Sequence, residues 1–199
     1  MQPKIMVTYT TNAGSTSEVA EAVAGELGCN GAEVVVRRME QVDDLSSFTA
    51  VVVGGPMILG WHRGAVKFLK KHEKALSRIP VAYFFTAMSL TRTGESSLDG
   101  VPIQVDPTLT KDPKNQSRLS FRERYATLKR YLGPVLKKTP QIRPASAAFF
   151  AGKVDYTRLK LPQMLFIMLV IGAQPGDRRN WEAIRKWAAG LSATFSSNL

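Results

Sequence analysis

The sequence predicts an α/β fold: a three-layer α/β/α sandwich around a five-stranded parallel sheet of order 2-1-3-4-5. Two observations lead to this class. Apolar runs rich in valine and aromatic residues alternate with helical patterns along most of the chain. These runs are nearly uninterrupted, as in strands that are covered on both faces. The 199 residues are enough to bury a sizeable core, and we expect one domain over residues 1–199.

The chain begins with a strand–turn–helix unit. The first strand is expected at Ile5–Tyr9, and a helix at Thr16–Leu27, where apolar residues return every three or four positions. Ser15 and Glu18 have the spacing of a capping box, which satisfies backbone N–H groups at a helix start. Gly28 is expected to end the helix.

The same alternation continues downstream. Strands are expected at Glu33–Arg38, Ala50–Gly55, Val81–Thr86 and Ala145–Gly152. Helices are expected at Ala65–Leu76, Ser120–Leu136, Pro162–Ile171 and Asn180–Leu191. Right-handed crossovers between parallel strands leave few other topologies.

A long basic insertion, about residues 91–144, separates the fourth and fifth strands. It holds eleven Lys and Arg against five Asp and Glu, within a chain of formal net charge +11. A connection of this length is usually functional or mobile, and a basic surface favours anionic partners. Arg92, Arg118 and Arg122 are candidates for binding an anionic substrate, because arginine pairs bidentately with carboxylates. A solvated basic face is the alternative.

Ligands of such sheets bind beyond the carboxyl ends of the strands, where the strand order reverses. Three loops are expected to meet there and to bind a cofactor. The first consists of Thr10, Thr11, Asn12, Ala13, Gly14, Ser15 and Thr16. The second contains Pro56, Met57, Ile58, Leu59, Gly60 and Trp61, and the third contains Thr86, Ala87, Met88, Ser89 and Leu90.

The first loop is suited to a phosphate. It offers backbone N–H groups, the hydroxyls of Thr10, Thr11 and Thr16, and the start of a helix. A capped turn without a ligand is the alternative. The chain lacks both the Gly-Lys-Ser/Thr of a P-loop and the three-glycine dinucleotide fingerprint. We therefore expect a mononucleotide, with Trp61 as the aromatic side chain that stacks on its ring.

The sequence gives little support for a metal site or a nucleic-acid-binding site. His62 and His72 are poorly spaced for a metal, and no nucleic-acid recognition motif is present. The single cysteine, Cys29, excludes an intrachain disulfide and is typical of a reducing compartment. No signal peptide is expected. The apolar run Met164–Ile171 is too short to span a membrane; it is either a core helix or a segment that faces a bilayer or a quinone tail.

Longer motifs surround these loops. Val51–Leu76 reads "VVVGGPMILGWHRGAVKFLKKHEKAL" and is followed by "IPVAYFFTAMSLT"; downstream stands "FFAGKVDYTRLKLPQMLFIMLVIGAQPGDRRNWEAIRKWA". These motifs resemble the flavodoxin-like, menaquinone-dependent protoporphyrinogen IX dehydrogenases of bacteria, and Thr10–Thr16 resembles the FMN-phosphate loop of flavodoxins. The resemblance covers nearly the whole chain. Departures occur at Pro56, at Ile58 with Leu59, and at Trp61.

The resemblance implies FMN as the cofactor, held by the three loops, with the backbone of Gly60 near the flavin N5 atom and no metal. It also implies an enzyme of haem biosynthesis. Such an enzyme dehydrogenates protoporphyrinogen IX, an anionic tetrapyrrole, and passes the electrons to menaquinone or another quinone. The single cysteine leads us to expect a cytoplasmic protein, with the inner face of the cell membrane as the alternative.

Other functions stay open. One is a flavodoxin-like FMN electron carrier, or a quinone reductase with another donor or a protein partner, although small carriers of this kind usually have acidic surfaces. Another is a binding module that has lost its flavin. Substrate conversion without a partner protein separates the enzyme from the carrier. Binding to an anionic membrane surface and a homo-oligomer are further expectations, and no nucleic-acid partner is expected.

Overall fold

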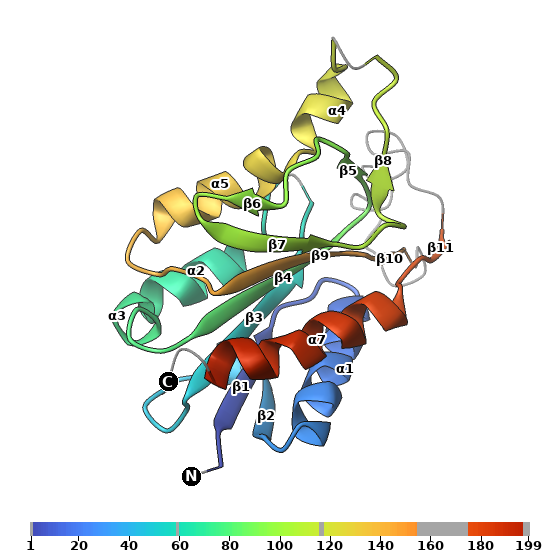
Figure 1. The fold of residues 1–199 in the computed structure, drawn as a ribbon. Coiled ribbons are helices and arrows are strands. Elements are labelled where there is room, and N and C mark those ends of the chain that lie inside the picture. The colour runs from blue at the N-terminus through green and yellow to red at the C-terminus, as the bar shows by residue number, and fades with distance from the viewer. Residues whose placement is uncertain (1, 59, 116–117, 155–174, 197–199) are drawn as a thin grey trace.

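The computed structural model describes residues 2–58, 60–115, 118–154 and 175–196. A seven-stranded sheet forms the centre of the molecule (Figure 1). Its strand order is β2-β1-β3-β4-β9-β7-β6. These strands are β1 (Lys4–Tyr9), β2 (Glu33–Arg38), β3 (Ala50–Pro56), β4 (Val81–Ala87), β6 (Ser97–Leu98), β7 (Val101–Val105) and β9 (Ser146–Ala151). The predicted order of five parallel strands is confirmed in β2-β1-β3-β4-β9.

The sheet is longer than the predicted five strands. Strand β7 pairs in parallel with β9, and β6 pairs antiparallel with β7. Both added strands come from the basic insertion, so part of residues 91–144 extends the sheet. The alternation of Val101, Ile103 and Val105 with polar or proline positions was the available signal, because a period of two is typical of a strand.

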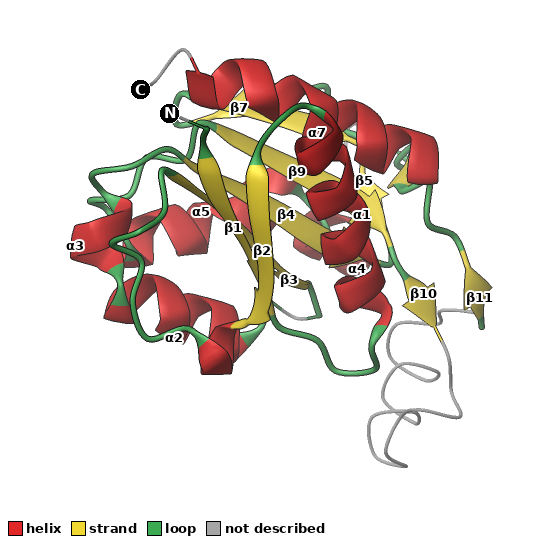
Figure 2. Ribbon diagram, turned by 90° about the horizontal axis from the view of Figure 1, so that it is seen from below, coloured by secondary structure: helices red, strands yellow, loops and turns green. Residues whose placement is uncertain are grey.

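Helices cover both faces of the sheet (Figure 2). On one face lie α1 (Ser15–Cys29) and α7 (Trp181–Ser196), whose Val23, Leu27 and Trp187 join one core. On the other lie α2 (Arg63–Lys71), α3 (Glu73–Leu76) and α5 (Leu128–Lys138). This double cover explains why every residue of β4 is buried.

Two predicted helices are interrupted. The predicted helix Ala65–Leu76 divides at His72 into α2 and α3. The predicted helix Ser120–Leu136 divides into α4 (Phe121–Tyr125) and α5, since Thr127 is extended and its hydroxyl accepts a hydrogen bond from the N–H of Arg130. Helix α7 continues beyond the predicted Leu191. The predicted helix Pro162–Ile171, and with it the run Met164–Ile171, lies outside the described residues.

Short elements complete the fold. They are η1 (Met39–Gln41), β5 (Leu90–Thr91), β8 (Thr110–Lys111), β10 (Lys153–Val154) and β11 (Gly176–Asp177). Strand β10 pairs with β11, which brings the chain back beside the end of β9. In the described part of the chain, no helix has the combined length and apolarity that crossing a bilayer requires.

Candidate functional site

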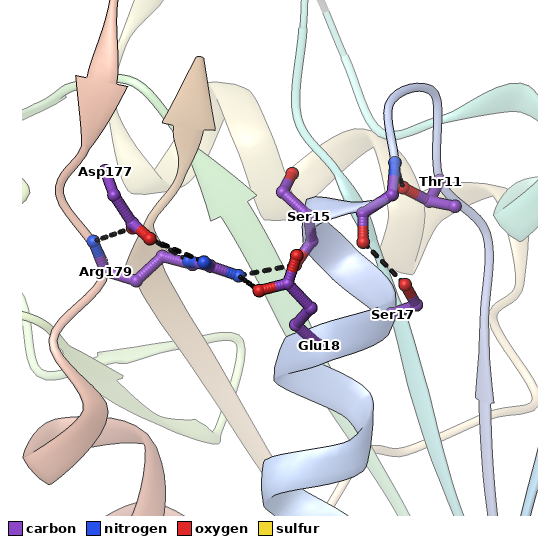
Figure 3. Close-up of polar contacts among 7 residues, drawn as sticks. Thr11, Ser15, Ser17, Glu18, Asp177 and Arg179 are labelled. Carbon is purple, nitrogen blue, oxygen red and sulfur yellow. Dashed lines mark hydrogen bonds and ion pairs between the residues drawn. The ribbon is translucent and has the colours of Figure 1, made fainter. Parts of the chain in front are cut away.

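The first loop connects β1 to α1 through a left-handed glycine. Gly14 has φ 88° and caps α1 without any side-chain hydrogen bond to the helix. Thr11 accepts a hydrogen bond from the Gly14 N–H at 2.9 Å, and the Ser17 hydroxyl donates to the Gly14 carbonyl (Figure 3). The predicted capping box is wrong: Ser15 is the first helical residue, and Glu18 forms an ion pair instead.

The first loop presents unused hydrogen-bond donors. Within the described residues, the backbone N–H groups at positions 11, 12, 13, 15 and 16 donate to no acceptor. They surround the start of α1, where the helix dipole favours negative charge. Buried or half-buried N–H groups normally have a partner, and a phosphate offers several oxygens to such a cluster. The donors present therefore fit the phosphate of a mononucleotide.

A cleft joins this loop to the two others. It is lined by Thr11, Asn12, Ala13, Ser15, Thr16, Pro56, Met57, Ile58, Thr86, Met88, Gly152, Lys153 and Val154. The structure thus brings together members of all three predicted loops. The sequence analysis did not predict that Gly152, Lys153 and Val154 line the cleft; of these, Lys153 is charged. The predicted strand order could have indicated them, because β9 neighbours β4 and the end of β9 must lie beside the third loop.

Several predicted residues lie beside the cleft rather than in its lining. The Thr10 hydroxyl is buried and lies 3.1 Å from Nδ1 of His62, so it links the first loop to the second. The Thr16 hydroxyl lies 3.2 Å from that of Thr86, which links the first loop to the third. Ala87 and Leu90 are buried in the core. Thr10 therefore positions the loop in this structure, which differs from its expected role as a donor to phosphate.

Trp61 does not face the cleft, contrary to expectation. Its side chain is 6% exposed and its ring centroid lies 4.6 Å from that of Phe85. Its Nε1 donates to the Gly55 carbonyl at 3.2 Å. A Cβ atom on Gly55 would lie 2.8 Å from this Nε1, so the glycine is what lets the indole pack against the end of β3. In this structure Trp61 is a core residue rather than a stacking partner.

Gly60 shapes a turn in the second loop. Gly60 has φ 125°, and its carbonyl accepts a hydrogen bond from the Ile58 N–H at 3.1 Å, which closes a tight turn. It lines a second cavity, between α2 and α5, and not the cleft. A position for its backbone near the flavin N5 stays a prediction. Leu59 lies outside the described residues.

Arg179 connects the C-terminal part of the chain to the first loop (Figure 3). Its side chain is 3% exposed and forms ion pairs with Glu18, at 2.8 Å, and with Asp177. It also donates to the Ser15 carbonyl at 3.3 Å. The hydrogen bond from Arg179 lowers the pKa of Asp177 below its ordinary value. Sequence reasoning assigned Arg179 no such role, although the Gly-Asp-Arg-Arg motif that holds it was among the longer motifs.

His62 stands between the first and second loops. It is the N-cap of α2, and its Nδ1 accepts a hydrogen bond from the Gly64 N–H at 3.1 Å. Burial lowers the pKa of His62, which favours the neutral ring that this contact requires. Within the described residues, no group of three or more His, Cys, Asp or Glu side chains is arranged to hold a metal ion.

The three arginines predicted to bind substrate are exposed and line neither cavity. Arg92 pairs with Asp112 at 3.1 Å and donates to the Thr110 hydroxyl at 3.1 Å, so its charge is partly compensated. Arg118 and Arg122 lie in or next to α4. The structure does not bring the three together with the cleft.

A family model described as a flavodoxin domain matches residues 6–179. The chain belongs to the flavodoxin-domain family. Among curated proteins, this flavodoxin-domain chain is similar to "Protoporphyrinogen IX dehydrogenase [quinone]" of Escherichia coli strain K12. The two are 24% identical over 200 residues, which is 95% of this chain and 94% of that protein.

Solved structures confirm the fold. Rubredoxin oxygen:oxidoreductase from Desulfovibrio gigas superposes with a TM-score of 0.55 at 14% identity, covering 99% of this chain and 37% of that chain. Flavodoxin 2 from Bacillus cereus superposes with a TM-score of 0.52 at 14% identity, covering 98% of this chain and 99% of that chain. With the family established, FMN is the cofactor of this chain, and the protein is a flavodoxin-like oxidoreductase.

Proposed function

We propose that this chain is an FMN-dependent dehydrogenase that oxidises protoporphyrinogen IX to protoporphyrin IX and passes the electrons to a quinone. The observation that carries the proposal is its similarity, over 95% of its length, to a protein named for this reaction. Free N–H donors at the first loop support the part of the proposal that concerns the flavin. The basic surface suits a substrate that carries carboxylates.

The roles of the residues follow from their positions. The N–H groups at positions 11, 12, 13, 15 and 16 would hold the phosphate of FMN, because they are free donors at a helix N-terminus. Met57, Ile58, Met88 and Val154 line the cleft with apolar surface and would hold the ring. When bound, FMN supplies hydride acceptance and onward electron transfer. The protein would position the ring and tune its potential.

An anaerobic turnover assay tests the proposal. FMN-loaded protein is mixed with protoporphyrinogen IX and a menaquinone analogue, and porphyrin fluorescence is followed. We expect fluorescence that depends on both protein and quinone, because each hydride and proton removed from the substrate reduces quinone to quinol. Controls without protein, without quinone and with apoprotein measure spontaneous oxidation. Fluorescence that rises equally in these controls contradicts the proposal.

An electron carrier is the alternative function. The match to a flavodoxin from the domain Archaea, which covers 97% of this chain and 99% of that chain, is compatible with it. A carrier would hold a reducible flavin and yet form no porphyrin unless a partner protein were added. Three further expectations stay predictions. The turnover assay tests quinone as the acceptor, and vesicle sedimentation tests contact with the inner face of a membrane. Light scattering tests assembly into a homo-oligomer.

A further inference from the structure

A second cavity, of about 410 Å³, lies between α2 and α5. Three of its lining residues are cationic: Arg63 at the start of α2, and Arg130 and Lys138 on α5. No lining residue carries a carboxylate. We call this hollow the cationic cavity. Its residues differ from the three arginines that the sequence suggested for substrate binding.

The positive charge of the cationic cavity is uncompensated. Among the described residues, Arg63, Arg130 and Lys138 form no ion pair, whereas Arg92 and Arg179 do. Helix α2 has no acidic residue in its first turn, where Arg63 adds its charge to the positive end of the helix dipole. An anion in the cavity would relieve this accumulation of charge. Because the site is concave, a small anion fits it better than the flat surface of an acidic protein.

The walls of the cationic cavity suit an organic ligand with apolar surface. The Arg130 guanidinium lies 5.3 Å from the centre of the Tyr125 ring, a cation–π contact that orients it. The Tyr131 hydroxyl donates to the Ser89 carbonyl at 3.3 Å, which ties α5 to the third cofactor loop. Val66 and Pro134 add apolar surface. The combination indicates an organic anion with a hydrophobic body and more than one acidic group.

One loop contributes residues to both the cationic cavity and the flavin cleft. Met57 and Ile58 line the cleft, whereas Gly60 and Trp61, which follow in the same loop, line the cavity. The second loop therefore has one site on each side. A ligand anchored in the cavity can extend past this loop toward the cleft, which is the arrangement that a substrate of the flavin needs.

We infer that the cationic cavity binds the carboxylates of the substrate that the flavin oxidises, with Arg63, Arg130 and Lys138 as the binding residues. The ligand class is a hydrophobic organic molecule with at least two carboxylates. Its identification as protoporphyrinogen IX rests on the proposed function. The inference itself concerns the place and the chemistry of substrate binding.

The test compares two double variants of the FMN-loaded protein. Arg63→Ala/Lys138→Ala removes two cavity charges, and Lys67→Ala/Lys137→Ala removes two exposed charges from the same helices but outside the lining. Each is titrated with protoporphyrin IX and with its dimethyl ester, which lacks the carboxylate charges. We expect the cavity variant to bind the diacid at least about tenfold more weakly, with ester binding and flavin content unchanged. The control variant should match the wild type.

The outcomes separate the inference from the proposed function. Equal diacid binding in the two double variants overturns the inference, and so does a cavity variant that oxidises protoporphyrinogen IX with the wild-type KM. If the wild type does not oxidise protoporphyrinogen IX, the proposed function fails. In that case anilinonaphthalene sulfonate, an aromatic anion, is the probe: loss of its binding in the cavity variant alone supports the cavity, and equal binding overturns it.

Discussion

The flavin cleft and the cationic cavity both suit anions, but they do so by opposite means. The cleft offers uncharged backbone N–H groups from one short stretch, at positions 11, 12, 13, 15 and 16. The cavity uses charged side chains from two helices that are distant in the sequence. A backbone site is held by the turn itself and tolerates changes of side chain. A side-chain site depends on each cation, and its strength depends on the surrounding salt.

Removing Arg179 should give the largest effect on the cleft. In Arg179→Ala, Glu18, Asp177 and the Ser15 carbonyl lose a shared partner. We expect unfolding stability to fall by about 2 kcal/mol, less than for a fully buried pair because both carboxylates are partly exposed. We also expect FMN to bind about tenfold more weakly, because Arg179 holds the start of α1. Thermal unfolding and flavin-fluorescence titration measure the two effects.

Arg178→Ala is the matched control for this prediction. Arg178 is exposed, and its backbone N–H donates to the Gly152 carbonyl at 3.3 Å, a hydrogen bond that alanine keeps. The control should retain wild-type stability and FMN affinity. Equal losses in the two variants would mean that general positive charge, rather than the Arg179 contacts, supports the cleft.

A side chain at Gly14 should weaken the cleft next. Gly14 has φ 88°, a conformation that costs an L-residue about 1–2 kcal/mol. We expect Gly14→Ala to raise the FMN dissociation constant about tenfold, because relaxing the strain moves the free N–H groups. Gly28→Ala is the control, since a Cβ atom at this position would have no atom within 4 Å and its φ is ordinary. Binding of anilinonaphthalene sulfonate in the cationic cavity should be unchanged in both.

The comparison also explains what the sequence could predict. The strand–loop–helix unit around residues 10–16 is local, so its elements, and the convergence of the three loops, follow from hydrophobic pattern and strand order. The sequence analysis missed the burial of Trp61. Its indole packs against the backbone of Gly55 only because Gly55 has no side chain, and these two residues belong to different elements. The glycine pair near the end of β3 was the available signal.

The sequence pattern did not predict the cationic cavity either, because the cavity also depends on contacts between residues that are distant in the sequence. The sequence showed that the insertion is basic, and it favoured Arg92, Arg118 and Arg122 because they follow the third loop. It did not show that α5 packs near α2 and brings Arg130 and Lys138 to Arg63. Long-range helix packing is set by the whole core, and no local signal in these residues indicates it.

Added salt should weaken ligand binding at the two sites to different extents, with a smaller effect than the substitutions above. Between about 0.05 and about 0.5 M NaCl, we expect FMN affinity to fall less than about threefold and protoporphyrin IX affinity to fall about tenfold. The physical reason is that exposed cations are screened strongly, whereas short hydrogen bonds from partly buried backbone donors are screened less. Arg63→Ala/Lys138→Ala should flatten the porphyrin curve and leave the FMN curve unchanged. If the affinities of the wild type for FMN and for protoporphyrin IX fell equally with salt, the claim that one site binds through backbone groups and the other through charged side chains would be wrong.

Acid should give the smallest effect, through His62. Burial lowers the pKa of this ring from 6.5, so the unfolded chain takes up a proton before the folded chain does, and stability falls as the pH drops below about 6.5. Protonated Nδ1 can no longer accept from the Gly64 N–H, and its contact with Thr10 changes. We expect FMN to bind about threefold more weakly at pH 5.5 than at pH 7.5. The phosphate of FMN titrates in the same range, so His62→Gln, which cannot titrate, is measured in parallel. A pH profile shared by the wild type and this variant would assign the whole effect to the phosphate and leave His62 a purely structural link between the first two loops.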